Sequence, residues 1–415
     1  MYLWLCGINR NRRLTPRARQ PRDLRPTRSA RDPLCLRWAT FGVAGFSAIL
    51  RGMHYGPVDA IDVTRLQRVL VIQLRHHGDV LLTSPVFTVL KNRAPALEID
   101  ALVYAETRDM LDLHPAIARV HVVSRDWKES GVLARLAQEW RLLTALRERA
   151  YELVVHLSEH PRGAWLARSL GARYAVAPDF ARKPRLWKRS FSHLVPLPPH
   201  ARRHRVEINL DALRRIGIQP GEDDRGLLLV PGEEAERSVE GLLAGQGLAA
   251  RSFIHFHPGS RWQFKCWPPE RAAALVDALA ERGERIALSA APDERELELT
   301  AEIRKRASAP IADFSGKLTL KQLAALSARA KLFIGVDSAP MHIAAAMQTP
   351  VVALFGPSGE LEWGPWRVPH RIVASGEHAC RPCGNDGCGG GKVSECLTRL
   401  PVEAALAAVD SLLAR

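Results

Sequence analysis

Short runs of β-branched and leucine residues alternate with amphipathic stretches along most of the chain. The run Arg68–Leu74 is continuously hydrophobic, as in a strand buried on both faces of a sheet. After a short polar loop, helical patterns and further strand-like runs follow one another at short spacing. This alternation predicts a parallel sheet with crossover helices. We expect strands at 68–74, 98–103, 120–123 and 153–157, and helices at 80–93, 107–113, 131–150 and 206–216.

A second αβ series occupies the rest of the chain, after the Pro-rich, basic stretch 178–204 and a Gly-rich, acidic stretch 217–250 that is typical of a linker with a short helix. Its length suits a second domain, because one hydrophobic core rarely exceeds about 250–300 residues. We predict strands at 252–256, 285–289, 331–336 and 351–355, and helices at 270–282, 293–307, 320–329, 340–347 and 401–415.

The predicted fold class is therefore α/β, with two Rossmann-like domains whose parallel sheets face a central cleft. The N-terminal domain would occupy residues 66–240 and the C-terminal domain residues 241–415. In open parallel sheets, ligands bind at the carboxyl ends of the strands. The loops at those ends are therefore the first places to look for a functional site.

Residues 1–65 are predicted to be a disordered basic extension. Residues 1–52 hold eleven Arg, no Lys and two acids, which accounts for +9 of the formal net charge of +15. This Arg- and Pro-rich segment shows neither helical nor strand periodicity. It is a basic tail, a targeting peptide, or translated sequence upstream of a start at Met53; we favour the last interpretation.

The remaining charge is modest and does not demand a nucleic-acid partner, and no nucleic-acid-binding motif is found. It suits an acidic substrate or an anionic membrane surface. Seven Cys in 415 residues do not make a disulfide scaffold. Four of them cluster late, at Cys380, Cys383, Cys388 and Cys396. Only the first pair has zinc-ribbon spacing, so both a bound metal and reduced structural thiols stay open, with the thiols favoured.

The loop after the first strand contains Gly78-Asp79. Gly permits a tight turn and close approach of a ligand, and Asp79 falls near a helix start that faces the cleft. Two interpretations compete for Asp79. It is either a helix N-cap or a general base that takes a proton from a substrate hydroxyl.

Two further loops carry polar residues at strand ends. The segment Val336–His342 runs from a buried strand into a helix whose first turn contains Pro340, and such a helix end can bind a diphosphate. Asp337 or Ser338 capping that helix is compatible with this role. The segment His257–Pro268 carries Ser260, Arg261 and Lys265, which suit either phosphate contact or a solvated basic loop.

Together these motifs resemble the heptosyltransferase family of inverting glycosyltransferases. The pattern is Gly-Asp after the first strand, then Pro-Gly-Ser…Lys-x-Trp-Pro, Gly-Val-Asp-Ser-x-x-x-His and Leu-Phe-Gly-Pro at 354–357. The resemblance covers essentially residues 66–415. Within the family, Leu-Arg-His-His-Gly-Asp at 74–79 and the late Cys run are most similar to the heptosyltransferase III branch.

The resemblance implies a GT-B fold and an inverting, metal-independent transfer. The donor would be ADP-L-glycero-D-manno-heptose and the acceptor the lipid A-Kdo-heptose inner core of lipopolysaccharide, with no cofactor. Asp79 would be the general base. The donor contacts would come from Ser260, Arg261, Lys265, Glu294 on the ribose, Leu318 on the adenine, Asp337, Ser338, Ala339 and His342 at the diphosphate. The acceptor contacts would come from Arg75, His76, His77 and Gly78.

This sequence departs from the family pattern at Gln73, where related enzymes often carry Lys. Arg75, His76 or His77 is the replacement that we expect for this cation. No Asp-x-Asp metal motif is found in the chain, and no metal-binding residue is predicted.

The family resemblance implies a cytoplasmic enzyme that contacts the inner membrane from its cytoplasmic face. The basic stretch 182–189 around Trp187 would hold the acidic core or touch the membrane, or else be a solvated loop.

Other functions on the same fold remain open from the sequence. The chain could be a GT-B transferase with another nucleotide-sugar donor or acceptor, or a non-catalytic nucleotide- or glycan-binding protein. Retention of Asp79 and Lys265 argues against the binding protein. A Rossmann dehydrogenase is disfavoured because the turn after the first strand lacks Gly-x-Gly-x-x-Gly.

Overall fold

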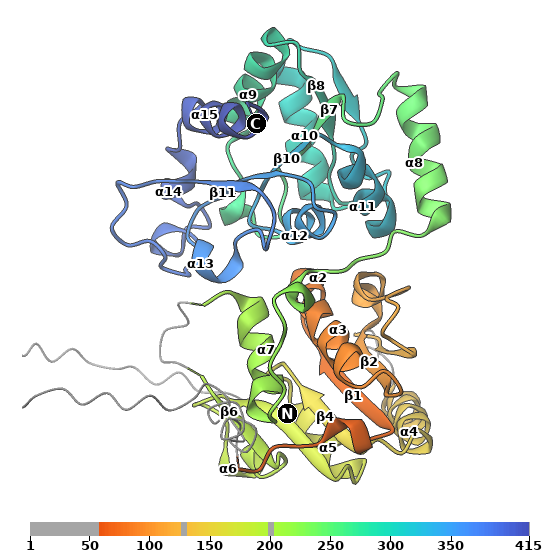
Figure 1. Ribbon diagram of the computed structural model, residues 1–415. Coiled ribbons are helices and arrows are strands. Elements are labelled where there is room, and N and C mark those ends of the chain that lie inside the picture. Colours follow the sequence, from red (N-terminus) through yellow and green to blue (C-terminus); the bar gives the residue numbers. More distant parts are fainter. Residues whose placement is uncertain (1–57, 126–130, 198–202, 415) are drawn as a thin grey trace, which may run out of the picture. The chain divides into compact units, whose positions relative to one another are not determined.

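Two parallel sheets organise the part of the chain that the computed structural model describes, residues 58–125, 131–197 and 203–414 (Figure 1). The basic segment 1–52 and Met53 lie outside these residues. The first sheet has six strands in the order β3-β2-β1-β4-β5-β6. They are β1 (Arg68–Gln73), β2 (Glu98–Tyr104), β3 (Arg119–Val123), β4 (Leu153–His156), β5 (Tyr174–Asp179) and β6 (His193–Pro196).

The second sheet repeats this topology with six strands in the order β12-β11-β10-β7-β8-β9. They are β7 (Phe253–His257), β8 (Arg285–Leu288), β9 (Ile311–Asp313), β10 (Leu332–Val336), β11 (Val351–Phe355) and β12 (His370–Ala374). When the strands of each sheet are numbered from one to six, both sheets read 3-2-1-4-5-6, the order of the Rossmann fold. All ten pairings are parallel, so the predicted fold class is confirmed.

Helices connect the strands and cover both sheets (Figure 1). Those around the first sheet are α2 (His77–Leu81), α3 (Ser84–Arg93), α4 (Val132–Glu148), α5 (Pro161–Ser169), α6 (Arg185–Lys188) and α7 (Arg205–Arg215), with 3-10 turns η1 (Val63–Arg65), η2 (Ala105–Met110) and η4 (Asp223–Arg225). Those that follow are α8 (Glu233–Gly245), η5 (Gln263–Lys265), α9 (Pro269–Glu281), α10 (Glu294–Arg306), α11 (Leu320–Arg329), α12 (Ala339–Ala346), α13 (Glu360–Trp363), η6 (Cys388–Gly390), α14 (Glu395–Thr398) and α15 (Val402–Leu413).

The side chains of β1 alternate between two hydrophobic cores. Val69 and Val71 pack with α3 and α7 on one face, in a core that also takes in Met341 and Ile343 of α12. Leu70 and Ile72 pack on the other face with α4, α5 and α6. Because both faces are covered, β1 reads as a continuous hydrophobic run.

The structure corrects several element boundaries. Residues 58–65 are not a disordered extension, because Ile61 and Val63 are buried and the Ile61 N–H donates to the Ile216 carbonyl at 2.9 Å. The helix expected at 80–93 is two helices, α2 and α3, with Pro85 in the first turn of α3, where its missing N–H costs nothing. The boundary at 240/241 falls inside α8, whose Val239 and Leu243 pack beneath the second sheet.

The last helix, α15, returns to the second sheet and packs against α9, β11 and β12. Just before it, the Leu400 carbonyl accepts hydrogen bonds from the buried Trp267 indole at 3.2 Å and from Arg271 at 3.0 Å. These bonds tie the end of the chain to the loop that follows η5. Among the described residues, no helix is long and apolar enough to cross a membrane.

Candidate active site

A cavity of about 870 Å³ opens where β1, β7 and β10 end. Its size lies within the usual range for small-molecule sites, about 300–1,000 Å³. Except for Glu294, the residues predicted from the sequence line this one cavity. They are Arg75, His76, His77, Gly78 and Asp79 from the first half of the molecule, and Ser260, Arg261, Lys265, Leu318, Asp337, Ser338, Ala339 and His342 from the second.

Asp79 lies in the first turn of α2 and is 7% exposed. The N-cap of α2 is His76, and no side chain caps this helix end, so Asp79 is not a capping residue. Its Oδ1 atom lies 3.3 Å from Nε of Arg75. The Asp79 carboxylate is therefore held by a cation on the cavity wall.

Gln73 does not line the cavity, because β1 directs it into the interior. It is buried, and its amide Nε2 is 3.4 Å from the Asp79 carbonyl oxygen. Burial lowers the pKa of His76 and of His77, so both imidazoles are neutral near pH 7. Of the three candidates for the missing cation, Arg75 is the one that is charged and contacts Asp79.

The turn between β10 and α12 exposes an uncapped helix end to the cavity. Ser338 is the N-cap, and no side chain accepts a hydrogen bond from the first N–H groups of α12. The Ser338 hydroxyl instead donates to the Val336 carbonyl at 3.3 Å. The Asp337 carboxylate pairs with Nζ of Lys265 at 2.6 Å. Pro340 has no N–H and the Met341 N–H donates to the Ser338 carbonyl at 3.1 Å, so the positive end of the helix dipole and the Lys265 ammonium group are what make this wall suitable for an anion.

His342 is buried one turn into α12, and this burial lowers its pKa to about 4. It is therefore a neutral imidazole near pH 7. A Cβ atom at Gly78 would lie only 3.0 Å from Cδ2 of His342, so α2 contacts α12 directly. Glycine at position 78 is what permits this close contact.

Glu294, the predicted ribose ligand, is exposed at the first position of α10 and is not part of the cavity wall. Glu296 is buried instead and lines the cavity. Its Oε2 atom accepts from the Ala291 N–H at 3.0 Å and lies 3.4 Å from Nε2 of His257. The helical pattern held a signal for this, because Glu296 shares the buried face of α10 with Thr300 and Ile303.

Further lining residues were not predicted from the sequence, among them Asp109 and Trp363. Trp363 lies in α13, next to Glu362, and the guanidinium of Arg205 is 5.6 Å from the centre of its ring. An Arg205 nitrogen lies 3.7 Å from Glu362. Burial raises the pKa of Glu362, an effect that Arg205 opposes. No sequence motif links α7 to α13, so only the fold reveals this group.

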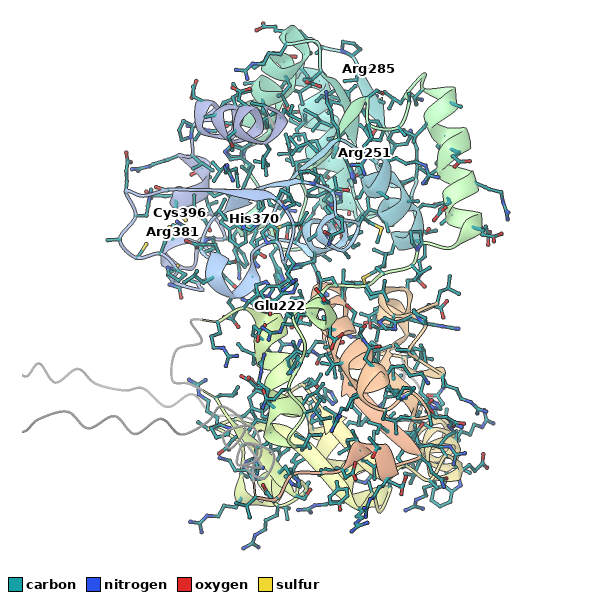
Figure 2. The ribbon with its side chains drawn as sticks, in the orientation of Figure 1. Glu222, Arg251, Arg285, His370, Arg381 and Cys396 are labelled. Atoms are coloured by element: carbon teal, nitrogen blue, oxygen red, sulfur yellow. The ribbon has the colours of Figure 1, made fainter. Side chains whose placement is uncertain are left out.

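A second cavity of about 750 Å³ adjoins the first and shares Trp262, Lys265 and Trp363 with it. Part of its wall is the cysteine-bearing loop, anchored by Arg381, which donates to the Gly356 carbonyl at 2.7 Å and pairs with Glu360 at 3.1 Å. Figure 2 shows Arg381 beside Cys396. The four thiols of this loop are free, and among the described residues no group of three or more His, Cys, Asp or Glu is arranged to hold a metal.

Sequence comparisons point to one family. The sequence profile described as glycosyltransferase family 9 (heptosyltransferase) matches residues 139–393. The chain is 35% identical over 295 residues to lipopolysaccharide heptosyltransferase 3 of Escherichia coli, a match that covers 71% of this chain and 84% of that protein. It is 28% identical over 326 residues to lipopolysaccharide heptosyltransferase 1 of Pseudomonas aeruginosa, covering 76% and 86% of the two chains.

Solved structures share the fold. A family 9 glycosyl transferase of Veillonella parvula superposes with a TM-score of 0.73 at 22% identity, over 86% of this chain and 99% of that one. The E. coli ADP-heptose lipopolysaccharide heptosyltransferase II superposes with a TM-score of 0.66 at 21% identity, over 84% and 99%. The two-sheet architecture is thus the GT-B fold, and the chain belongs to glycosyltransferase family 9, the heptosyltransferases.

Proposed function

We propose that the protein transfers L-glycero-D-manno-heptose from ADP-heptose, with inversion, to the heptose/Kdo inner core of lipopolysaccharide. One observation carries the chemistry. A carboxylate, Asp79, and an anion-binding wall built from Lys265 and the end of α12 line the same cavity. An inverting transfer needs a base for the acceptor hydroxyl on one side and a stabilised leaving group on the other.

Asp79 is the general base in this proposal. The acceptor hydroxyl gives its proton to the carboxylate as its oxygen attacks the anomeric carbon of the donor. Arg75, 3.3 Å from Asp79, keeps the carboxylate oriented and offers a cation to the acidic core sugars. His76, His77 and Gly78 complete the acceptor side of the cavity.

The ADP leaving group gains negative charge as the glycosidic bond breaks. We assign its stabilisation to the Lys265 ammonium group, the N–H groups at the start of α12, Ser260 and Arg261. His342, neutral because of its burial, offers a hydrogen bond to the diphosphate. With these donors supplied by the protein, the proposed reaction needs neither a divalent metal nor a cofactor.

The nucleoside would occupy the part of the cavity lined by Leu318, Asp293 and Glu296. Leu318 packs on the adenine in this proposal. The ribose contact expected of Glu294 passes to Asp293 or Glu296, since Glu294 is exposed outside the wall.

The acceptor is anchored in a lipid bilayer through lipid A. We therefore propose that the enzyme works in the cytoplasm, on the cytoplasmic face of the inner membrane, and that it contacts this membrane peripherally. The names of the relatives support the lipopolysaccharide acceptor.

The test is a transfer assay with ADP-heptose and a heptose-bearing core acceptor, with EDTA present and the product read by mass spectrometry. A product heavier by one heptose would support donor, acceptor class and metal independence together. If ADP-heptose were neither bound nor hydrolysed, the proposed donor would be wrong. Activity that disappears with EDTA and returns with Mg²⁺ would refute metal independence alone.

A further inference from the structure

Helix α4 carries an apolar stripe along one face. Only the C-terminal part of this stripe is buried. Positions 133, 136, 140 and 143 recur at helical spacing and therefore lie along one face. Leu143 is buried against the first sheet, whereas Leu133, Leu136 and Trp140 are 83%, 60% and 66% exposed. None of the residues that the structure describes covers this part of the stripe.

The neighbouring helices extend this exposed apolar area. Trp165 of α5 is 44% exposed and Leu186 of α6 is 64% exposed. Helices α4, α5 and α6 pack on the same face of the first sheet (Figure 1). They are tied together by the Arg162–Glu139 ion pair, by Arg147 donating to the Ser169 carbonyl at 3.0 Å, and by Arg168 donating to the Leu186 carbonyl. We call the exposed apolar residues Leu133, Leu136, Trp140, Trp165 and Leu186 the α4–α6 surface.

The topology brings the α4–α6 surface to the acceptor side of the cavity. In a parallel sheet, each helix that follows a strand begins at the carboxyl edge of the sheet and runs back. Leu133 and Leu136 lie in the N-terminal half of α4, Trp140 and Trp165 lie at the midpoints of α4 and α5, and Leu186 lies in the short helix α6. Asp79 follows β1 at this same edge of the first sheet. The end of the α4–α6 surface that carries Leu133 and Leu136 therefore lies toward the edge of the sheet that also holds Asp79.

The charges around the surface are mostly positive. Exposed cations flank the apolar side chains, namely Arg135, Arg141, Arg168, Arg182, Arg185 and Arg189. Of the two acids in these three helices, Glu139 is paired with Arg162 and Glu148 lies at the far end of α4. Exposed Trp and Leu side chains within a basic rim match the interface of an anionic bilayer. Trp187 does not contribute, because it is buried against Phe191.

We propose that the α4–α6 surface docks on an anionic lipid bilayer. Leu133, Leu136 and Trp140 enter the headgroup region, while the arginine side chains contact lipid phosphates. Only the role of this docking, which is to bring a lipid-anchored acceptor to Asp79, rests on the proposed function. Binding to lipid requires neither donor nor acceptor.

Sedimentation with vesicles tests the proposal on the full chain. Vesicles of phosphatidylcholine with phosphatidylglycerol are compared with pure phosphatidylcholine vesicles, both free of lipopolysaccharide. The variant Leu133→Gln/Leu136→Gln/Trp140→Gln should bind the anionic vesicles at least about tenfold more weakly than the parent. The matched control Leu297→Gln/Val393→Gln/Leu413→Gln, which alters exposed apolar residues of the second half, should bind like the parent. Residues 1–57 are the same in all three proteins.

A charge-reversed variant, Arg141→Glu/Arg185→Glu/Arg189→Glu, tests the basic rim and should also lose binding, most clearly at low salt. Brominated lipids should quench Trp fluorescence in the parent, and Trp140→Phe/Trp165→Phe should remove most of this quenching. Equal vesicle binding by the parent and the α4 variant would overturn the proposal. So would an α4 variant that changes only the oligomeric state, because the surface would then bind a second copy.

Two measurements separate this proposal from the proposed function. Each variant should still bind ADP in calorimetry, which shows that it is folded, and should still act on a soluble, delipidated core acceptor. If the parent fails to transfer heptose but binds anionic vesicles through the α4–α6 surface, the docking stands and the proposed reaction falls. If the parent transfers heptose but vesicle binding does not depend on this surface, the proposed reaction stands and the docking is wrong.

Discussion

The two halves of the molecule share one topology and differ in what they place at the equivalent strand ends. The fourth strand of each sheet, β4 or β10, leads into a helix with proline in its first turn, α5 or α12. In α5 the His160 side chain caps the helix by accepting from the Arg162 N–H at 3.2 Å. In α12 no side chain caps the end, which faces the cavity instead.

The α5 end is thus closed by a side chain of its own, whereas the α12 end is open at the cavity, where a ligand can reach it. A side-chain cap is typically worth about 1 kcal/mol to a helix, so an uncapped end at a cavity is a cost that a bound anion can remove. The first strand of each sheet, β1 or β7, also leads to a different kind of charged residue. The end of β1 leads to a carboxylate, Asp79, and the end of β7 leads to a cation, Lys265.

Removing the carboxylate of the first half should have the largest effect. Asp79→Asn keeps the size of the side chain but cannot accept the proton, so kcat should fall by about 10²–10⁴-fold. The affinity for ADP, measured by calorimetry, should not change. Asp109→Asn, in the same cavity wall, is the matched control and should retain most of the activity. Equal losses in the two variants would remove Asp79 from the role of base.

Removing the cation of the second half should weaken donor binding. Lys265→Met loses a charge-assisted hydrogen bond to phosphate and leaves Asp337 unpaired beside the diphosphate. We expect ADP to bind about 10–100-fold more weakly, as measured by calorimetry. Lys305→Met, which removes an exposed cation in the last turn of α10 outside the cavity wall, is the matched control and should leave ADP binding unchanged. Unchanged affinity in the lysine variant would place the diphosphate elsewhere.

Each half buries a neutral histidine, His156 just before α5 in the first and His342 within α12 in the second. Both halves should therefore lose stability over the same pH range. Burial lowers the pKa of His156, before α5, to about 3 and that of His342, within α12, to about 4. In the unfolded chain each imidazole has a pKa of about 6.5. As the pH falls below that value, the unfolded state binds a proton that the folded state does not yet bind. The free energy of unfolding should therefore be constant above about pH 7 and decrease below about 6.5.

The decrease should be about 2 kcal/mol for each of these histidines between pH 7.5 and pH 5, and His114 and His204, whose pKa values burial also lowers to about 4, add to the total. Urea unfolding followed by circular dichroism measures it. Carboxylates with lowered pKa values, such as Asp100, titrate below this range and do not confuse the result. Equal stability at pH 7.5 and pH 5 would show that these imidazoles are not buried as described.

The smallest effect should come from making α12 resemble α5. Ser338→Asp places a carboxylate at the N-cap, where it can accept from the Met341 N–H, since Pro340 has none, and where it repels a diphosphate. ADP should bind roughly tenfold more weakly, while the folded protein gains up to about 1 kcal/mol. The converse change, His160→Ala, should cost about 1 kcal/mol and leave ADP binding intact. If Ser338→Asp tightened ADP binding, the uncapped end would not be the anion site.

The sequence, together with the family resemblance, was sufficient to predict the fold class and about half of the residues that line the cavity. Strand-to-helix alternation predicted two parallel sheets, and polar residues at strand ends must converge in such sheets. It failed where periodicity was weak. Helix α5 and strand β5 were not predicted at all, and the prolines and cations of 178–204 concealed the short strand β6 and the buried Trp187. The short edge strands β9 and β12 were missed as well.

Side-chain direction and long-range contacts were the other limits. Glu294 and Glu296 are two positions apart on a helix, so they point to different sides, and Glu296, not Glu294, lines the cavity. Arg205 and Glu362 meet only because the fold joins α7 to α13. The exposed stripe of α4 looked like an ordinary amphipathic helix, because the sequence does not show that the sheet covers only its C-terminal half.

The carbonyl group of Leu400, which holds both the Trp267 indole and Arg271, gives the end of the chain an influence on catalysis. Lys265 lies two residues before Trp267, so the loop that presents the cation is fastened from behind by the residues that lead into α15. Shortening the protein by its final helix would remove that fastening. Because α15 also contributes Val409 and Leu412 to the core of the second half, such a truncation should lower the stability of that half and, at a distance from the deleted residues, the affinity for the nucleotide.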